Sequence, residues 1–256
     1  MKLSWFSFPE RRTPYLVWWR HNANGGGWQG GAGGYVGRMP QPAPLPAYLG
    51  LSIESDETVW NGMFPLQRIR FRQRRFDGAL SRLRTWELWR RGRAVAVLPY
   101  DPASDKVVLI EQFRLPALAA GVDPVMVEVP AGLCEPGEEV AVCLARETRE
   151  ELGLPLGRIR PVGDYVLSPG GSDERVWLHV GEVAAPPCGP DGLAGHGGLE
   201  SEAEDIRLRV WPAEEAIAAA LAGKMHNVIT ALALIWLASQ RAELRATWGT
   251  LWRKPA

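Results

Sequence analysis

The segment from Val129 to Leu154 constrains the fold more than any other part of this chain of 256 residues. A short apolar run ends at Val129, and a loop rich in glycine and proline follows it. The stretch Glu138–Leu152 has the apolar spacing of an amphipathic helix and is followed by Gly153, a residue type that commonly ends helices. Positions three and four apart share one helical face. The segment therefore predicts a strand, a tight loop and a helix on which three carboxylates gather: Glu147, Glu150 and Glu151.

These three glutamates have two interpretations. Like charges on one helical face repel each other and weaken a helix by about 0.3 kcal/mol per pair, so the face could be a solvated one on which Arg146 and Arg149 offset the repulsion. Alternatively, the carboxylates form a site for a hard divalent cation. Mg²⁺ prefers oxygen ligands and is commonly held by one or two carboxylates together with the phosphates of a substrate. The spacing of the surrounding residues distinguishes the two interpretations.

The fixed residues of the segment follow a long pattern, which in chain order is Gly132, Glu138 after five residues, Arg146-Glu147 after seven more, Glu150-Glu151 and Gly153-Leu154. This pattern resembles the Nudix box, G-x5-E-x7-R-E-U-x-E-E-x-G-U. Thr148 is the one departure, because that position usually carries a bulky aliphatic residue, but threonine is still β-branched and can pack. The chain is therefore identified as similar to Nudix hydrolases, which cleave nucleoside diphosphates linked to another group. The resemblance favours the cation site over the solvated face.

Residues outside the box resemble the ADP-ribose pyrophosphatase subfamily. Pro169 lies fifteen positions beyond Leu154, about where that subfamily carries a proline, and further similar segments are 172–175, 202–207 and 223–224. The resemblance covers about residues 49–248. It implies hydrolysis of the pyrophosphate bond of ADP-ribose to AMP and ribose 5-phosphate. The alternatives are a pyrophosphatase for other nucleoside diphosphate sugars, such as ADP-glucose or GDP-mannose, and a catalytically silent module that binds ADP-ribose.

The resemblance also implies a metal site and a catalytic base. The expected ligands of Mg²⁺, or of Mn²⁺ in its place, are Glu147, Glu150, Glu151 and the main-chain carbonyl of Ala131. Glu151 is counted among the catalytic residues as well, and Glu138 and Arg146 are expected to brace the loop against the helix through an ion pair. Glu202 is favoured as the general base, with Glu204 as its alternative or as a metal partner, although the two could also belong to a surface acidic loop. The stretch 184–201 is expected to be a mobile lid.

Substrate contacts follow from the same resemblance. Arg114 matches an arginine that contacts the diphosphate, which a guanidinium binds through a fixed fork of donors; its alternative is a surface ion pair. Ser168 and Gly170 are expected beside the terminal ribose. Three residues before the strand 93–99 are expected to help hold the adenine: Trp86, Glu87 and Arg91. Trp86 could stack on the base or belong to the core.

The expected fold is a Nudix α/β/α sandwich at residues 93–256, preceded by a β-rich arm at 49–92 that joins a homodimer interface and by a disordered extension at 1–48. The extension is rich in glycine, proline and tryptophan; it could be a tail for nucleic acid or membrane surfaces, or the product of a start codon upstream of Met39 or Met63. Strands are predicted at 51–53, 67–72, 93–99, 107–112, 125–129, 161–167, 175–183 and 206–211. Helices are predicted at 138–152, 213–222 and 226–244.

Composition excludes several classes of protein. Lys and Arg number 29 and Asp and Glu number 29, so the formal net charge is zero, which argues against a nucleic-acid partner that needs a basic field. No apolar run approaches the roughly 20 residues of a membrane span. The three cysteines lack the spacing of a zinc site and cannot form a closed disulfide framework, which indicates free thiols in a reducing cytoplasm.

Overall fold

The structure is a computed structural model that describes residues 42–199 and 204–249. Of the expected extension, residues 1–41 lie outside this range, and residues 42–48 form no helix or strand. The expected base Glu202 also lies outside the described residues. Within them, no helix is both long and apolar enough to cross a bilayer.

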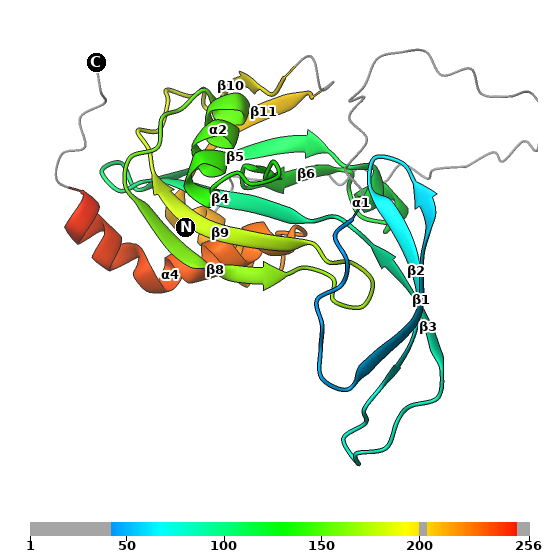
Figure 1. Cartoon of the computed structure of the whole chain (residues 1–256). Helices are drawn as coiled ribbons and strands as arrows, with labels where there is room; N and C mark the ends of the chain where they lie inside the picture. Colours follow the sequence, from blue (N-terminus) through cyan, green and yellow to red (C-terminus); the bar gives the residue numbers. More distant parts are fainter. Residues whose placement is uncertain (1–41, 200–203, 250–256) are drawn as a thin grey trace, which may run out of the picture. The chain divides into compact units, whose positions relative to one another are not determined.

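The arm is a three-stranded antiparallel sheet in the order β1 (Leu51–Asn61), β2 (Pro65–Gln73), β3 (Arg84–Trp89) (Figure 1). Side chains alternate between the faces of a strand, so Ile69 and Phe71 are buried while Arg68 and Arg70 are exposed. β3 was not predicted, because arginines flank its tryptophans and obscure the apolar pattern. A β-rich arm is as expected, and its third strand is an addition to the prediction.

The large sheet has eight strands: β4 (Arg93–Asp101), β5 (Lys106–Phe113), β6 (Val125–Glu128), β7 (Ala131–Leu133), β8 (Ile159–Val166), β9 (Arg175–Glu182), β10 (Leu193–Gly197) and β11 (Ile206–Pro212). Its order is β10-β11-β5-β4-β9-β8, with β6 paired to β5 and β7 to β4. β4 and β9 run parallel, and the other pairs are antiparallel. β4 therefore lies in the middle of the sheet, and its residues Ala94–Tyr100 are buried without interruption.

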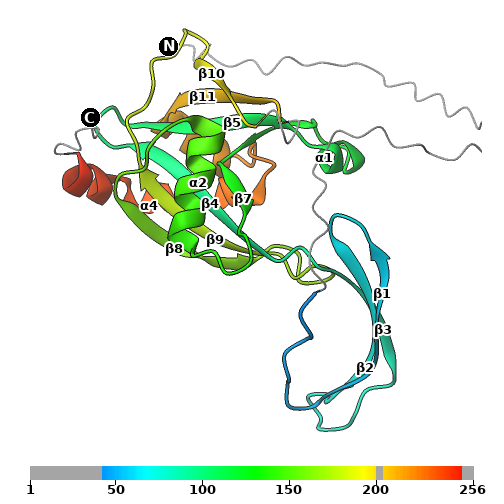
Figure 2. The same cartoon turned by 45° about the horizontal axis from the view of Figure 1, so that its top comes forward.

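Helices cover both faces of this sheet. Val95 and Val97 of β4 pack with α2 (Val140–Leu152), whereas Ala96 and Leu98 pack with α3 (Ala213–Leu221) and α4 (Val228–Trp248). Figure 2 shows α2 crossing the near face of the sheet, with α4 behind it. A strand buried on both faces reads as a continuous apolar run rather than an alternating one. The α/β/α sandwich expected from the sequence is confirmed.

Asp173 joins the end of β3 to the start of β4. Its Oδ1 accepts hydrogen bonds from the main-chain N–H groups of Arg91 (2.7 Å) and Gly92 (3.1 Å), and its Oδ2 accepts one from Arg90 Nε (2.6 Å). Trp89 N also donates to the carbonyl of Gly171. These contacts fix the segment between the two sheets at the loop that follows β8.

The predicted helix at 138–152 is nearly correct: α2 ends as expected, and Gly153 caps it in the left-handed conformation (φ 64°). Other predictions differ from the structure. Four elements were missed: β3, β7, β10 and α1 (Leu115–Ala119). β10 lies inside the stretch that was expected to be a lid, and it is hydrogen-bonded to β11, so that stretch is not irregular throughout.

Candidate active site

The brace between loop and helix forms as expected. Arg146 Nε donates to Glu138 Oε1 (3.0 Å), and its Nη2 donates to Glu138 Oε2 (3.0 Å) and to the carbonyl of Leu133 (3.1 Å). Glu138 also accepts from Glu135 N (2.9 Å). The hydrogen bond from Arg146 lowers the pKa of Glu138 to about 2. The glycine-rich loop is thus fastened to the middle of α2.

Glu147 lies directly against the backbone of this loop. An atom added as a Cβ on Gly132 would lie 1.9 Å from Glu147 Cδ and 2.1 Å from each carboxylate oxygen. Burial raises the pKa of Glu147 to about 7, Arg146 opposes the shift, and Glu150 and Glu204 add to it. The motif glycine is therefore required for space, because any side chain would displace the carboxylate.

Glu151 is the most deeply buried of the three helix carboxylates. It is 3% exposed, and its Oε2 accepts a hydrogen bond from Ala131 N (3.2 Å). Burial raises its pKa well above the ordinary value, and the charges of Glu147 and Glu204 add to the effect. Glu150 is less buried and accepts from Arg146 Nη1 (3.1 Å). The structure thus places Ala131, Glu147 and Glu151 side by side.

Glu204 and Arg114 complete the group. Glu204 precedes β11, and its Oε2 accepts from Leu199 N (3.2 Å). Burial by itself lowers the pKa of Arg114, but the hydrogen bond and charge of Glu128, then the charges of Glu151 and Glu204, raise it above its ordinary value. Arg114 donates to Glu128 through Nε (3.0 Å) and Nη2 (2.7 Å). Arg114 therefore forms an ion pair, which was the alternative to a contact with the diphosphate. The charge of Glu151 on α2 still acts on it.

Glu147, Glu151 and Glu204 repel one another, and two of them have raised pKa values; Arg146 offsets part of this charge through its ion pair with Glu147 (2.8 Å). Over residues 42–199 and 204–249, no group of three or more acidic, histidine or cysteine side chains is arranged so that it could hold a metal ion. Mg²⁺ commonly uses only one or two carboxylates, with water and substrate phosphates as its other ligands, so Glu147 and Glu151 would suffice as its protein ligands. Because a cation binds deprotonated carboxylates, its binding would release protons near neutral pH.

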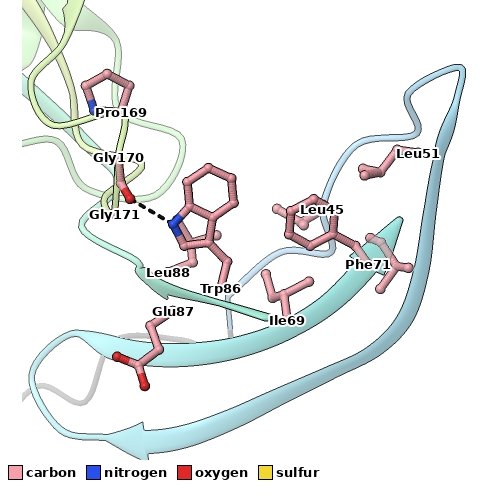
Figure 3. Close-up of a pocket in the computed structure, with 11 residues that line it drawn as sticks. Leu45, Leu51, Ile69, Phe71, Trp86, Glu87, Leu88, Pro169, Gly170 and Gly171 are labelled. Carbon is pink, nitrogen blue, oxygen red and sulfur yellow. Dashed lines mark hydrogen bonds between the residues drawn. The ribbon is translucent and has the colours of Figure 1, made fainter. Parts of the chain in front are cut away.

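A second site lies between the arm and the loop after β8. It is a cavity of about 200 Å³ (Figure 3), and it is lined by Leu45, Leu51, Ile53, Ile69, Phe71, Trp86, Glu87, Leu88 and Pro169–Gly171. Trp86 stacks on Phe71 with ring centroids 5.8 Å apart, and its Nε1 donates to the carbonyl of Gly170 (2.9 Å). Figure 3 shows the Glu87 carboxylate directed away from the Trp86 ring. Among the described residues that line the cavity, none belongs to α2.

Two predicted contact residues are not part of that lining. Arg91 pairs with Glu174 (3.1 Å) and lies over the rings of Phe64 and Trp89. Ser168 uses its carbonyl to accept from the N–H groups of Gly171 and Ser172. The structure therefore brings Trp86 and Gly170 together but leaves Arg91 and Ser168 outside the cavity wall.

Sequence reasoning missed Glu128 and Asn227. Glu128 is 5% exposed and is bound by both Arg114 and Asn227. The available signal was a lone acid at the end of an otherwise apolar strand, separated by Val129 from the Pro-Ala-Gly loop. A buried carboxylate needs a hydrogen-bond or ion-pair partner. A carboxylate at Glu128 therefore predicts a cationic side chain or hydrogen-bond donors from elsewhere in the chain.

Comparison with known proteins agrees with this fold. The NUDIX domain model matches residues 90–232, which is more than half of the chain, and the chain belongs to the Nudix family. It is 39% identical over 213 residues to the ADP-ribose pyrophosphatase of Escherichia coli strain K12, covering 82% of this chain and 100% of that protein. The GDP-mannose pyrophosphatase of Salmonella arizonae is 29% identical over 188 residues, covering 73% and 94% respectively. A crystal structure of an ADP compounds hydrolase shares the fold, with a TM-score of 0.57 and 19% identity over 80% of this chain and 100% of that one.

Proposed function

We propose that this chain hydrolyses the pyrophosphate bond of ADP-ribose to AMP and ribose 5-phosphate with Mg²⁺, or Mn²⁺, as cofactor. The observation that carries the proposal is a pair of mutually repelling carboxylates on α2: Glu147 lies against the backbone of Gly132, and the buried Glu151 lies beside Ala131 within electrostatic reach of Arg114. The 39% identity to an ADP-ribose pyrophosphatase, over that protein's full length, supports the choice of substrate.

Each group has a distinct part in the proposed reaction. A divalent ion would neutralise the diphosphate and lower the pKa of a bound water. Glu147 and Glu151 would hold the ion, with Glu150 nearby. Arg114 would donate to a phosphate oxygen, and Glu204 or Glu202 would take the proton as water attacks one phosphorus in line.

The cavity beside Trp86 is proposed to take the adenine ring. Its walls are mostly apolar, and Trp86 is 42% exposed although Phe71 stacks on its ring, so a planar base could pack against the part of the indole that Phe71 leaves uncovered. The hydrogen bond from Trp86 to Gly170 ties the arm to the loop where the ribose is expected. The proposed adenine site and the proposed ribose site would then both depend on the loop that carries Gly170.

A substrate panel tests the proposal. Purified protein is incubated with ADP-ribose, ADP-glucose, GDP-mannose and NADH, each with Mg²⁺ and with EDTA, and products are identified by mass. We expect AMP and ribose 5-phosphate from ADP-ribose with Mg²⁺ alone, and a kcat/KM at least about tenfold above that for GDP-mannose. Hydrolysis in EDTA would contradict the role of the carboxylates. A preference for another sugar would favour the broader pyrophosphatase, and binding without turnover would favour the silent module.

A homodimer is proposed for the working protein. Large apolar side chains are exposed near the end of β1 and in the turn after it, and at the end of β5 and the start of α1: Trp60, Met63, Phe113 and Leu115. Such side chains commonly mark an interface, and a two-fold dimer is the most frequent assembly of one chain. Light scattering of the purified protein should give twice the chain mass of 28.2 kDa. A monomer at micromolar concentration would refute it.

A further inference from the structure

Glu128 is a buried carboxylate that ends β6 and faces Arg114. Its side chain is 7% exposed, against 39% for Arg114. The guanidinium donates to it from Nε (3.0 Å) and from Nη2 (2.7 Å), and both hydrogen bonds go to the same oxygen, Oε2. Among the described residues, Arg114 Nη1 has no hydrogen-bond partner. One edge of the guanidinium is thus occupied, and the remaining amino group is unpaired within residues 42–199 and 204–249.

The second oxygen of Glu128 is also held. Oε1 accepts from Asn227 Nδ2 (3.0 Å). Asn227 is the N-cap of α4, and its Oδ1 accepts from Thr230 N (3.0 Å) and Thr230 Oγ1 (3.2 Å). The same Thr230 hydroxyl accepts from Val129 N (2.9 Å). This closed set of contacts joins β6 to α4 and fixes the plane of the Glu128 carboxylate.

Without this partner, Arg114 would have other carboxylates to bind. Glu151 and Glu204 both act on its charge, and an arginine released from Glu128 would be drawn toward them. It would then compete with a cation for the same oxygens. An arginine held in place also avoids the loss of side-chain entropy that binding would otherwise cost.

We propose that Glu128, oriented by Asn227, is a positioning residue that directs Arg114 toward the substrate diphosphate and keeps it away from Glu151 and Glu204. The inference rests on the proposed function, because it assigns Arg114 Nη1 to a phosphate oxygen. Glu128 does not touch the substrate. Its effect passes through Arg114 alone, and this is what separates it from a merely structural ion pair.

The test is a double-mutant cycle with Glu128→Gln and Arg114→Ala. Glutamine keeps the volume of Glu128 and can still accept from Asn227, but it lacks the charge that holds the guanidinium. We expect Glu128→Gln to raise KM for ADP-ribose about tenfold with kcat within about threefold, since a charge-assisted hydrogen bond is being weakened. In the Arg114→Ala background the same change should add nothing to KM.

A second variant keeps the proposal testable if Glu128→Gln does not fold. Asn227→Ser retains a good N-cap for Thr230 but cannot donate an amide hydrogen bond to Glu128. It should raise KM in the same direction by about threefold and lose less thermal stability than Asn227→Ala, because the cap is kept although Glu128 Oε1 loses a donor. Asn227→Ala loses the cap and the donor together, so the difference in KM and in stability between the two variants shows what loss of the cap adds.

The outcomes separate this inference from the proposed function. Wild-type protein that neither cleaves nor binds ADP-ribose overturns both. Active wild type with an unchanged KM in Glu128→Gln, or an equal rise in KM with and without Arg114, overturns the positioning role only. Calorimetric binding of ADP-ribose in EDTA gives a readout without the metal: the dissociation constant should weaken about tenfold in Glu128→Gln, and an unchanged constant refutes the inference.

Discussion

Replacing Glu151 by glutamine should lower kcat by about 10²- to 10³-fold, on the scale of losing one key electrostatic group in an active site. Glutamine keeps the size of the side chain and an oxygen that can accept the hydrogen bond from Ala131 N. It lacks the negative charge that a divalent ion requires. Steady-state kinetics with ADP-ribose and saturating Mg²⁺ measure the loss.

The fold should survive this change. Burial raises the pKa of Glu151 well above its ordinary value, which means that the metal-free fold disfavours its negative charge, and glutamine removes that charge without changing the size of the side chain. The free energy of unfolding in EDTA should therefore change by less than about 1 kcal/mol. Thermal unfolding followed by circular dichroism checks this, so that lost activity is not mistaken for lost structure.

Glu139→Gln is the matched control. Glu139 is exposed at the N-cap of the same helix, and its side chain makes no capping hydrogen bond. The chemical change is identical, but no carboxylate of the cluster is altered, so kcat should stay within about twofold of wild type. A folded Glu151→Gln protein with full activity, or an equal loss in both variants, would show that the Glu151 charge has no special role.

The sequence predicted those parts of the site that depend on one continuous segment. The spacing from Gly132 to Leu154 lies on a single loop and helix, so helical geometry groups Glu147 with Glu151, and the resemblance to the Nudix box pairs Arg146 with Glu138. The N-cap of α4 could not be connected to this segment in the same way. Asn227 lies 99 positions from Glu128, and only the packing of α4 against the sheet brings the two together.

The side-chain pattern of the sequence also failed to predict strands whose position is set by backbone hydrogen bonds to distant segments. β10 contains two glycines in five residues, a composition typical of loops, yet its main chain pairs with β11. β3 has the exposure of a surface strand, and its order comes from β2 on one edge and from the loop around Asp173 at its end. In both cases hydrogen-bond partners distant in sequence override a weak side-chain signal.

Gly132→Ala should lower kcat by about 10²-fold, because the new methyl group would occupy the position of the Glu147 carboxylate. The added Cβ would lie 1.9 Å from Glu147 Cδ, so the carboxylate must move away from Ala131. The backbone itself can accept alanine, since Gly132 does not have the positive φ of other glycines in the chain. Kinetics with ADP-ribose and Mg²⁺ measure the effect.

Two further variants show whether crowding of Glu147 is the cause. Adding Glu147→Asp to Gly132→Ala shortens the carboxylate by one carbon and should restore activity by about threefold or more, because the side chain no longer meets the methyl group. Gly137→Ala lies in the same loop with φ 82° and nothing within 4 Å of its Cβ position. It should cost about 1 kcal/mol of stability through backbone strain and leave kcat within about twofold. If Gly137→Ala lost as much activity as Gly132→Ala, loop strain rather than the position of Glu147 would explain both, and the space required by that carboxylate would not be the reason for the glycine.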